Sequence, residues 1–152
     1  MASAILVDTS GNFLLQQRDD ILGILYPGKV GLFGGHREGG ETFLQCVVRE
    51  IHEEISLFVP PEDFEHLASY EGEDPEVEGA ALCGEFFVAR NVPVQSLVIT
   101  EGALLSVKPD QLIAIERKLT PTARFAMSAF SNRNRPAVSY PGHRGKTQSG
   151  VT

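Results

Sequence analysis

The sequence lacks tryptophan, has only two cysteines and contains no long apolar run. Cys46 and Cys83 are too few for a disulfide framework, so we expect a reducing compartment, the cytoplasm. No apolar stretch approaches the roughly 18 residues that a membrane-spanning helix needs. The first residues carry no basic segment and reach an acid at Asp8, which is unlike a secretion signal. These absences exclude a disulfide-stapled secreted domain and a helical membrane protein from the expected classes.

Positive charge is scarce and unevenly placed. The chain has 13 Lys and Arg against 20 Asp and Glu, a net charge of −7. Residues 131–152 contain four of the basic residues and no acid, which leaves −11 for residues 1–130. Such an acidic body does not favour nucleic acid polymers, because their binding depends on Lys and Arg neutralising phosphates. A small anionic substrate can still bind if metal ions supply positive charge locally.

The length of 152 residues suits one domain. We expect that domain to span 1–135, followed by a basic tail rich in Gly, Pro and Ser over 136–152. Two short apolar runs at 2–7 and 13–17, separated by turn residues, predict a β-hairpin. Residues 21–35 are rich in glycine and predict a loop whose backbone can approach a ligand closely.

Two helices and three further strands are expected beyond that loop. Thr42 and Gln45 have the spacing of a capping box, and the helix that they open carries an apolar stripe of Leu44, Val47, Val48, Ile51 and Ile55. A second helix is expected from Thr120-Pro121 to about residue 132. Strands are expected near 66–71, 81–89 and 104–107, with the acidic stretch 71–79 as a solvated hairpin loop. Mixed strands with a helix on each face predict an α/β/α sandwich.

The most informative segment runs from 35 to 57. Glu50, Glu53 and Glu54 recur within one predicted helix, and at about 100° per residue they lie within roughly a third of its circumference. Three carboxylates on one face repel one another unless a cation lies between them. Hard divalent ions such as Mg²⁺, or Mn²⁺ in its place, take oxygen ligands and are completed by a substrate's phosphates. The segment therefore predicts a divalent metal site that acts on phosphates.

The same segment resembles the signature of the Nudix hydrolases. That signature places a Gly, a Glu, an Arg-Glu pair, a Glu-Glu pair and two aliphatic residues at fixed spacing. The matching residues are Gly35, Glu41, Arg49, Glu50, Ile51, Glu53, Glu54 and Leu57. Ser56 is the one departure, because the family has glycine there. A left-handed backbone costs a non-Gly residue about 1–2 kcal/mol, so this departure concerns the turn after the helix.

The resemblance implies a fold and a set of residue roles. The fold is the Nudix-type α/β/α sandwich with a mixed sheet between helices. By family analogy Glu50 and Glu54 are the principal metal ligands, and the carbonyl of Gly34 is another. Glu53 is expected to be a ligand or the base that orients the attacking water. Support of the site is expected from Gly35, Arg49 and Glu41.

Arg49 and Glu41 are expected to interact directly. A guanidinium matches a carboxylate bidentately, so Arg49 is expected to pair with a signature glutamate, and Glu41 is the candidate partner. A second interpretation of Glu41 is a favourable charge near the positive end of the helix.

Further candidates lie outside the signature. Many Nudix enzymes recruit a distant loop carboxylate, and Glu101 is the candidate here, with Glu78 and Glu85 behind it. Arg18, at a strand end, is a candidate for a substrate phosphate or for a surface ion pair with a neighbouring acid. In the absence of tryptophan, the candidate base-stacking residues are Phe33, Tyr26 and Phe87. His36 and His52 have no partner at metal-ligand spacing and are expected to be polar surface residues.

The predicted activity is metal-dependent hydrolysis of a diphosphate linkage by water attack at phosphorus. The leading substrate is a nucleoside triphosphate, including modified ones, which makes the chain a pyrophosphohydrolase. The alternatives are a nucleotide sugar, ADP-ribose or a dinucleoside polyphosphate. A Nudix-fold module that binds nucleotides without cleaving them is an alternative of another class. A homodimer is compatible with the sequence.

Overall fold

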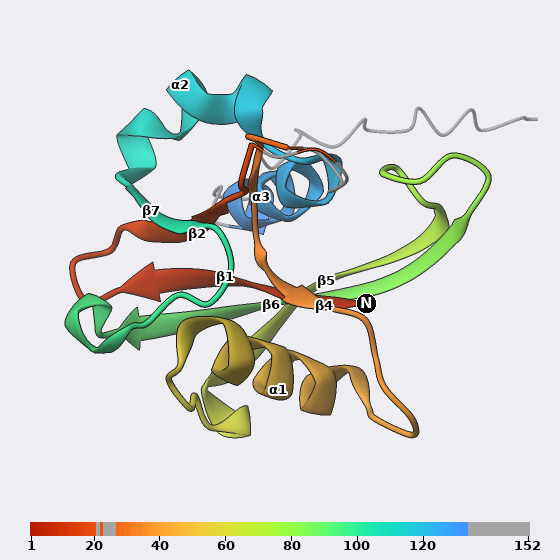
Figure 1. The fold of residues 1–152 in the computed structure, drawn as a ribbon, viewed down its shortest axis with the longest axis horizontal. Helices are drawn as coiled ribbons and strands as arrows, with labels where there is room; N and C mark the ends of the chain where they lie inside the picture. The colour runs from red at the N-terminus through yellow and green to blue at the C-terminus, as the bar shows by residue number, and fades with distance from the viewer. Residues whose placement is uncertain (21, 23–26, 134–152) are drawn as a thin grey trace, which may run out of the picture.

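A computed structural model describes residues 1–20, 22 and 27–133 of the chain. A mixed β-sheet lies between two helical layers (Figure 1). Helix α1 (Phe43–Ile55) covers one face, and α3 (Pro121–Arg133) with the short α2 (Leu112–Ile115) covers the other. The three layers are the α/β/α arrangement that the sequence predicts.

The sheet is built around one parallel pair at its centre. Strand β1 (Ala2–Asp8) runs parallel to β6 (Ala81–Val92), and β5 (Phe64–Glu73) pairs antiparallel with β6 at one edge. On the other side β1 forms the predicted hairpin with β2 (Phe13–Gln17), and β2 pairs with β7 (Ala103–Val107). Strands β5 and β6 form a long hairpin that extends past the helices (Figure 1).

The expected loop at 21–35 is wrong over its last part, because two short strands form there. Strand β3 (Val30–Gly31) pairs with β2, and β4 (Phe33–Gly35) pairs with the first half of β1. Between β3 and β4 the chain therefore crosses from the β2 side to the β1 side of the sheet. Tertiary pairing decides this structure, because isolated segments of two or three residues carry no period from which a strand can be predicted. The crossing brings β4 against α1.

Helix α1 forms as its local sequence predicts. The Thr42 hydroxyl accepts a hydrogen bond from the Gln45 N–H at 3.1 Å, and the Gln45 side chain accepts one from the Thr42 N–H at 2.9 Å. The face packed on the sheet includes Val47, Ile51 and Ile55, each fully buried. This burial fixes the rotation of the helix, so the glutamates on its adjacent face are held in a defined direction.

Other expected boundaries need adjustment. Strand β5 continues to Glu73, so the hairpin loop is residues 74–80 and starts three residues later than expected. The helical stretch from Pro109 to Lys118, which includes α2, was not predicted because its α-helical part is a single turn of four residues. Helix α3 spans Pro121–Arg133, close to the prediction. The predicted tail 136–152 and the domain boundary at 135 lie outside the described residues.

Within the described part of the chain, no helix combines the length and the apolar character needed to cross a membrane.

Candidate active site

Helix α1 presents its glutamates in different environments. The Glu54 side chain lines a cleft of about 250 Å³ between α1, the sheet and the β5–β6 loop. Glu50 is 17% exposed and lies against β4, whereas Glu53 is 59% exposed at the rim. One helical face thus carries two half-buried carboxylates, Glu50 and Glu54, and one exposed carboxylate, Glu53.

The backbone of strand β4 lies close to the carboxylates of Glu54 and Glu50. The Gly34 N–H donates a hydrogen bond to Glu54 Oε2 at 2.9 Å. A Cβ at Gly34 would lie 2.3 Å from the Ala2 carbonyl oxygen, and one at Gly35 would lie 2.5 Å from the Glu50 carboxylate carbon. Gly34 therefore permits the close approach of β4 to β1, whereas Gly35 leaves the space that the Glu50 carboxylate occupies.

Arg49 joins the carboxylates of the signature. Its guanidinium donates two hydrogen bonds to Glu41, at 2.7 and 2.8 Å, which is the expected bidentate pair. The same group reaches Glu50 at 3.0 Å and Glu53 at 3.3 Å, and it donates to the His36 carbonyl at 3.2 Å. The hydrogen bond from Arg49 lowers the pKa of Glu41 to about 2, and the Glu41 carboxylate in turn raises the pKa of Arg49. Arg49 thus fixes the side-chain positions around Glu50.

Glu54 is the carboxylate whose proton affinity is most changed. Burial is the main cause that raises the pKa of Glu54 to about 8, against the opposing effect of the Gly34 N–H. The negative charges of Glu50, Glu101 and Glu53 raise it further. A cation beside this half-buried carboxylate would favour its ionised form at neutral pH. Perturbed carboxylates in a cleft are typical of functional sites.

The cleft also contains candidates from distant parts of the sequence. Glu101 and Arg18 both line it together with Glu54. The Gln16 amide, 9% exposed, lies in the same cleft and donates to the Glu101 carbonyl at 3.1 Å. Gln16 was missed by sequence reasoning, although a polar residue at the end of the apolar run Phe-Leu-Leu was a signal.

The wall opposite α1 comes from the acidic hairpin loop. The loop was predicted to be solvated, but Asp74 and Glu76 are half-buried and line the cleft. The Thr122 hydroxyl donates to Glu76 Oε1 at 2.8 Å, which ties the loop to the first turn of α3. No motif in the sequence connects residue 76 with residue 122, so only the fold brings them together.

Other candidates are not placed in the cleft. Phe33 is fully buried in the core under α1, and Phe87 is 6% exposed in the same core, so their expected role in base stacking is wrong. Tyr26 lies outside the described residues. Glu85 instead bonds to His66 at 2.5 Å and Ser69 at 2.6 Å on the outer strands.

The two histidines are both exposed, as expected. His36 also lines the cleft, whereas the His52 ring packs on the Phe58 ring.

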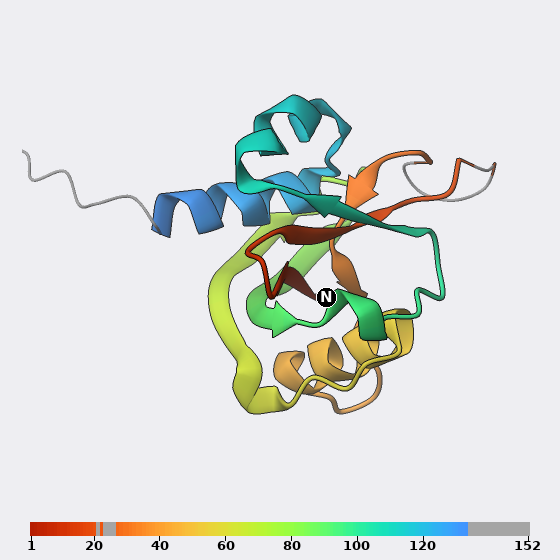
Figure 2. The same ribbon diagram turned by 90° about the vertical axis from the view of Figure 1, so that its left-hand side faces the viewer.

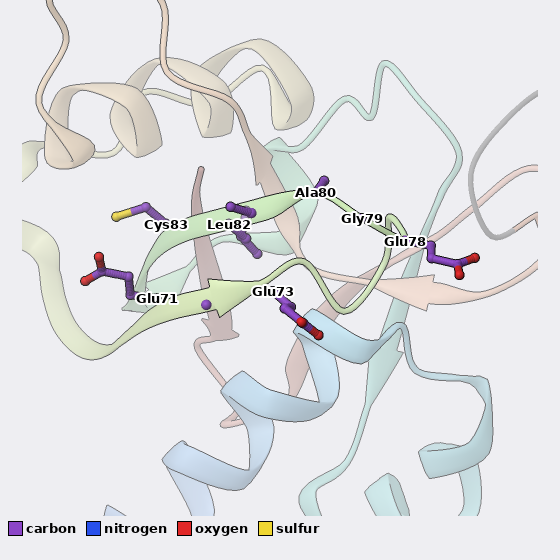
Figure 3. Close-up of a pocket in the computed structure, with 9 residues that line it drawn as sticks. Glu71, Glu73, Glu78, Gly79, Ala80, Leu82 and Cys83 are labelled. Carbon is purple, nitrogen blue, oxygen red and sulfur yellow. The ribbon is translucent and has the colours of Figure 1, made fainter.

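A larger hollow of about 930 Å³ lies elsewhere, on the β5–β6 hairpin. Figure 3 shows that its side chains come from both strands and their connecting loop, Glu78 among them. It contains no residue of α1 or β4 and no basic group. The smaller cleft at Glu54 is therefore the candidate active site.

The donor set at that cleft fits a divalent ion. Within residues 1–20, 22 and 27–133, no three His, Cys, Asp or Glu side chains converge as a complete metal site. Magnesium needs few protein ligands, because it keeps several waters and binds substrate phosphates. The clustered carboxylates of α1 supply the hard oxygen donors that such an ion takes.

Comparisons with known proteins identify the family and the fold of the chain. The family described as "NUDIX domain" matches residues 1–122. No curated protein sequence matches the chain significantly. The ORF135 protein of E. coli has a similar structure, with a TM-score of 0.67 and 24% identity over 90% of this chain and 92% of that one. A MutT protein from Methanosarcina mazei Go1 has a TM-score of 0.71 and 20% identity, over 89% and 94%.

A third similar structure contains a ligand. The NUDIX domain of Shewanella oneidensis NrtR, solved with ADP ribose, has a TM-score of 0.68 and 17% identity over 87% of this chain and 85% of that one. At these identities the structural likeness concerns the fold alone. With the family match, it confirms the predicted sandwich with a mixed sheet between helices.

Proposed function

The chain belongs to the Nudix family and is a Nudix-type hydrolase, and from this premise we propose that it hydrolyses nucleoside triphosphates at a diphosphate linkage with Mg²⁺. Mn²⁺ is proposed as a substitute ion. Water attacks at phosphorus, and modified nucleotides are included in the substrate class. The proposal concerns small nucleotides and no nucleic acid polymer.

The observation that carries the proposal is Glu54 in its cleft. Its carboxylate is half-buried and accepts a hydrogen bond from the Gly34 N–H. Burial, with a smaller contribution from three neighbouring carboxylates, raises its pKa to about 8. Such an arrangement costs stability in a protein that only binds a neutral ligand. Binding of a divalent cation in the cleft would offset that cost.

The metal is proposed to be held by Glu50, Glu53 and Glu54 with the Gly34 carbonyl. When bound, a divalent ion would neutralise phosphate charge and make the phosphorus more electrophilic. Arg49 keeps Glu50 and Glu53 oriented through its hydrogen bonds. Gly35 leaves the space that the Glu50 carboxylate occupies.

Glu53, Glu54 and Glu101 are the proposed catalytic carboxylates. Glu101 lines the cleft together with Glu54, and its exposed position gives it access to water. Glu101 or Glu53 accepts a proton from the attacking water. Arg18, on the cleft wall, is proposed to bind a substrate phosphate through its guanidinium.

A second candidate substrate is ADP-ribose. The support for it is the Shewanella oneidensis NUDIX domain, whose structure contains ADP ribose and aligns over 87% of this chain. Both substrates present a nucleoside diphosphate to the same carboxylates. They differ in the group attached to it, which would lie toward the wall made by Asp74, Glu76 and Thr122.

A substrate panel tests the proposal. Nucleoside triphosphates, nucleotide sugars, dinucleoside polyphosphates and ADP-ribose are compared by kcat/KM with Mg²⁺ or Mn²⁺, and with EDTA as the control. We expect turnover of triphosphates to be highest and to be abolished by EDTA. Nucleotide binding without turnover of any substrate would overturn the enzymatic proposal in favour of a binding module. Preferred turnover of ADP-ribose would replace the substrate.

A further inference from the structure

The segment before β7 caps the helix that carries the glutamates. The N–H of Val98 donates to the Ile55 carbonyl, and that of Thr100 to the Glu54 carbonyl, both at 3.0 Å. The Thr100 hydroxyl donates to the Glu53 carbonyl at 3.2 Å. These carbonyls belong to the last turn of α1, where no partner exists inside the helix. Figure 2 shows the segment running from beside α1 into β7.

The same segment is attached to β2 on its other side. The Gln16 amide donates to the Glu101 carbonyl at 3.1 Å. Gly102 has φ +67°, and a Cβ there would lie 2.3 Å from the Gln17 carbonyl oxygen. Only glycine combines that conformation with so close an approach. Residues 98–102 are therefore attached both to α1 and to β2, and we call them the clamp segment.

This attachment opposes a repulsion. Glu101 lies close enough to Glu54 for its negative charge to act on that side chain. Both carboxylates line the same cleft, so without attachment the loop would move away from the helix to separate the like charges. The Glu101 side chain itself is exposed and contributes little to holding the loop in place.

We propose that the clamp segment fixes Glu101 opposite Glu54, and that Gln16 and Thr100 are positioning residues that act through Glu101. The inference rests on the proposed function to the extent that Glu101 takes part in the reaction. A displacement of about 1 Å of a reacting group costs on the order of 100-fold in rate. Two hydrogen bonds donated by residues outside the signature thus set the geometry of a carboxylate that the signature does not contain.

Paired substitutions test the positions. Gln16→Leu removes the bond to Glu101, and Gln17→Leu is its control, because the neighbouring Gln17 amide donates instead to the Gly28 carbonyl at 2.8 Å. Thr100→Val removes the hydroxyl that bonds to α1, and Thr100→Ser keeps one. We expect kcat to fall about 10- to 100-fold in Gln16→Leu and Thr100→Val. Both controls stay within about twofold of the wild type.

A double-mutant cycle separates positioning from direct contact. In a Glu101→Gln background, Gln16→Leu is expected to lower kcat no further, because the group through which it acts is already lost. A Gln16→Leu loss of the same size in both backgrounds overturns the proposal, since Gln16 then contacts the substrate or serves the fold. A Gln16→Leu rate equal to that of Gln17→Leu overturns it as well.

Amide hydrogen exchange of the metal-free protein gives a readout that needs no substrate. The Thr100 amide is expected to exchange about two- to tenfold faster in Gln16→Leu, the size of one lost hydrogen bond. Unchanged exchange overturns the clamp. If the wild type hydrolyses no nucleotide, the proposed function fails, while the exchange rates still decide whether Gln16 holds the segment.

Discussion

The two walls of the cleft are built in different ways. The α1 wall takes its carboxylates from one helix, with spacing set by the helical repeat and side chains held by Arg49. The opposite wall takes Gln16 from β2, Glu76 from a hairpin loop and Thr122 from α3. The first wall is local in sequence, whereas the second exists only after the sheet has formed. We therefore expect substitutions of the α1 carboxylates to act mainly on turnover, and loss of the contact between Glu76 and Thr122 to act mainly on substrate binding.

The largest loss of turnover is expected from a substitution on the α1 wall. Glu54→Gln keeps the size of the side chain but removes its charge, so we expect kcat to fall on the order of 1000-fold, as when a group that acts mainly in the transition state is lost. Steady-state kinetics with Mg²⁺ measures it, and circular dichroism checks the fold. Glu62→Gln, at an exposed acid that does not line the cleft, is the control. Near-normal kcat in Glu54→Gln would reassign the metal site.

The next largest effect is expected from a substitution in β4, whose backbone lies against the carboxylates of the α1 wall. Gly35→Ala places a Cβ 2.5 Å from the Glu50 carboxylate carbon and must displace it. We expect a loss of about 10- to 100-fold in kcat or in metal affinity, the usual cost of disturbing the support of a metal ligand. Gly40→Ala is the matched control, because a Cβ at Gly40 meets nothing within 4 Å. Equal activity of the two variants would contradict the role given to Gly35.

A smaller effect is expected on the opposite wall. Thr122→Val removes the hydroxyl that bonds to Glu76, and one such bond is worth about 0.5–1.5 kcal/mol. KM should therefore rise about two- to tenfold with kcat nearly unchanged, because no carboxylate of α1 is touched. Thr122→Ser should retain the wild-type KM. A fall in kcat comparable to that of Glu54→Gln would mean that the walls do not divide the work in this way.

The sequence predicted the local parts of the structure well. The capping box at Thr42, the apolar stripe of α1 and the β1–β2 hairpin depend on residues close in the chain, and all three form. The Arg49–Glu41 contact follows from the same signature. Such features depend on short-range spacing, which a single sequence records directly.

The parts that were missed depend on contacts between distant segments. Phe33 is a plausible stacking residue in a glycine-rich loop. Once β4 pairs with β1, however, the Phe33 side chain is buried in the core. Glu76 was assigned to a solvated loop because nothing in its neighbourhood indicates Thr122 as a partner. Burial of this kind is decided by the assembled sheet and leaves no periodic pattern in the chain.

The smallest expected effect concerns the position where the signature departs from its family. Ser56 adopts the left-handed conformation (φ 57°, ψ 27°), and its N–H donates to the His52 carbonyl at 3.0 Å. The turn is therefore kept despite the side chain, at a cost of about 1 kcal/mol relative to glycine. Ser56→Gly should raise the free energy of unfolding by about that amount in urea denaturation.

Ser56→Ala is the control for that prediction, because alanine also has a Cβ and should gain no stability. Since Glu50, Glu53 and Glu54 all precede the turn, kcat should be unchanged in both variants. Equal stability of the glycine and alanine variants would show that Ser56 carries no backbone strain. A stability gain without a rate change would show that the α1 wall tolerates a departure after its carboxylates, because the clamp segment already holds the last turn of the helix.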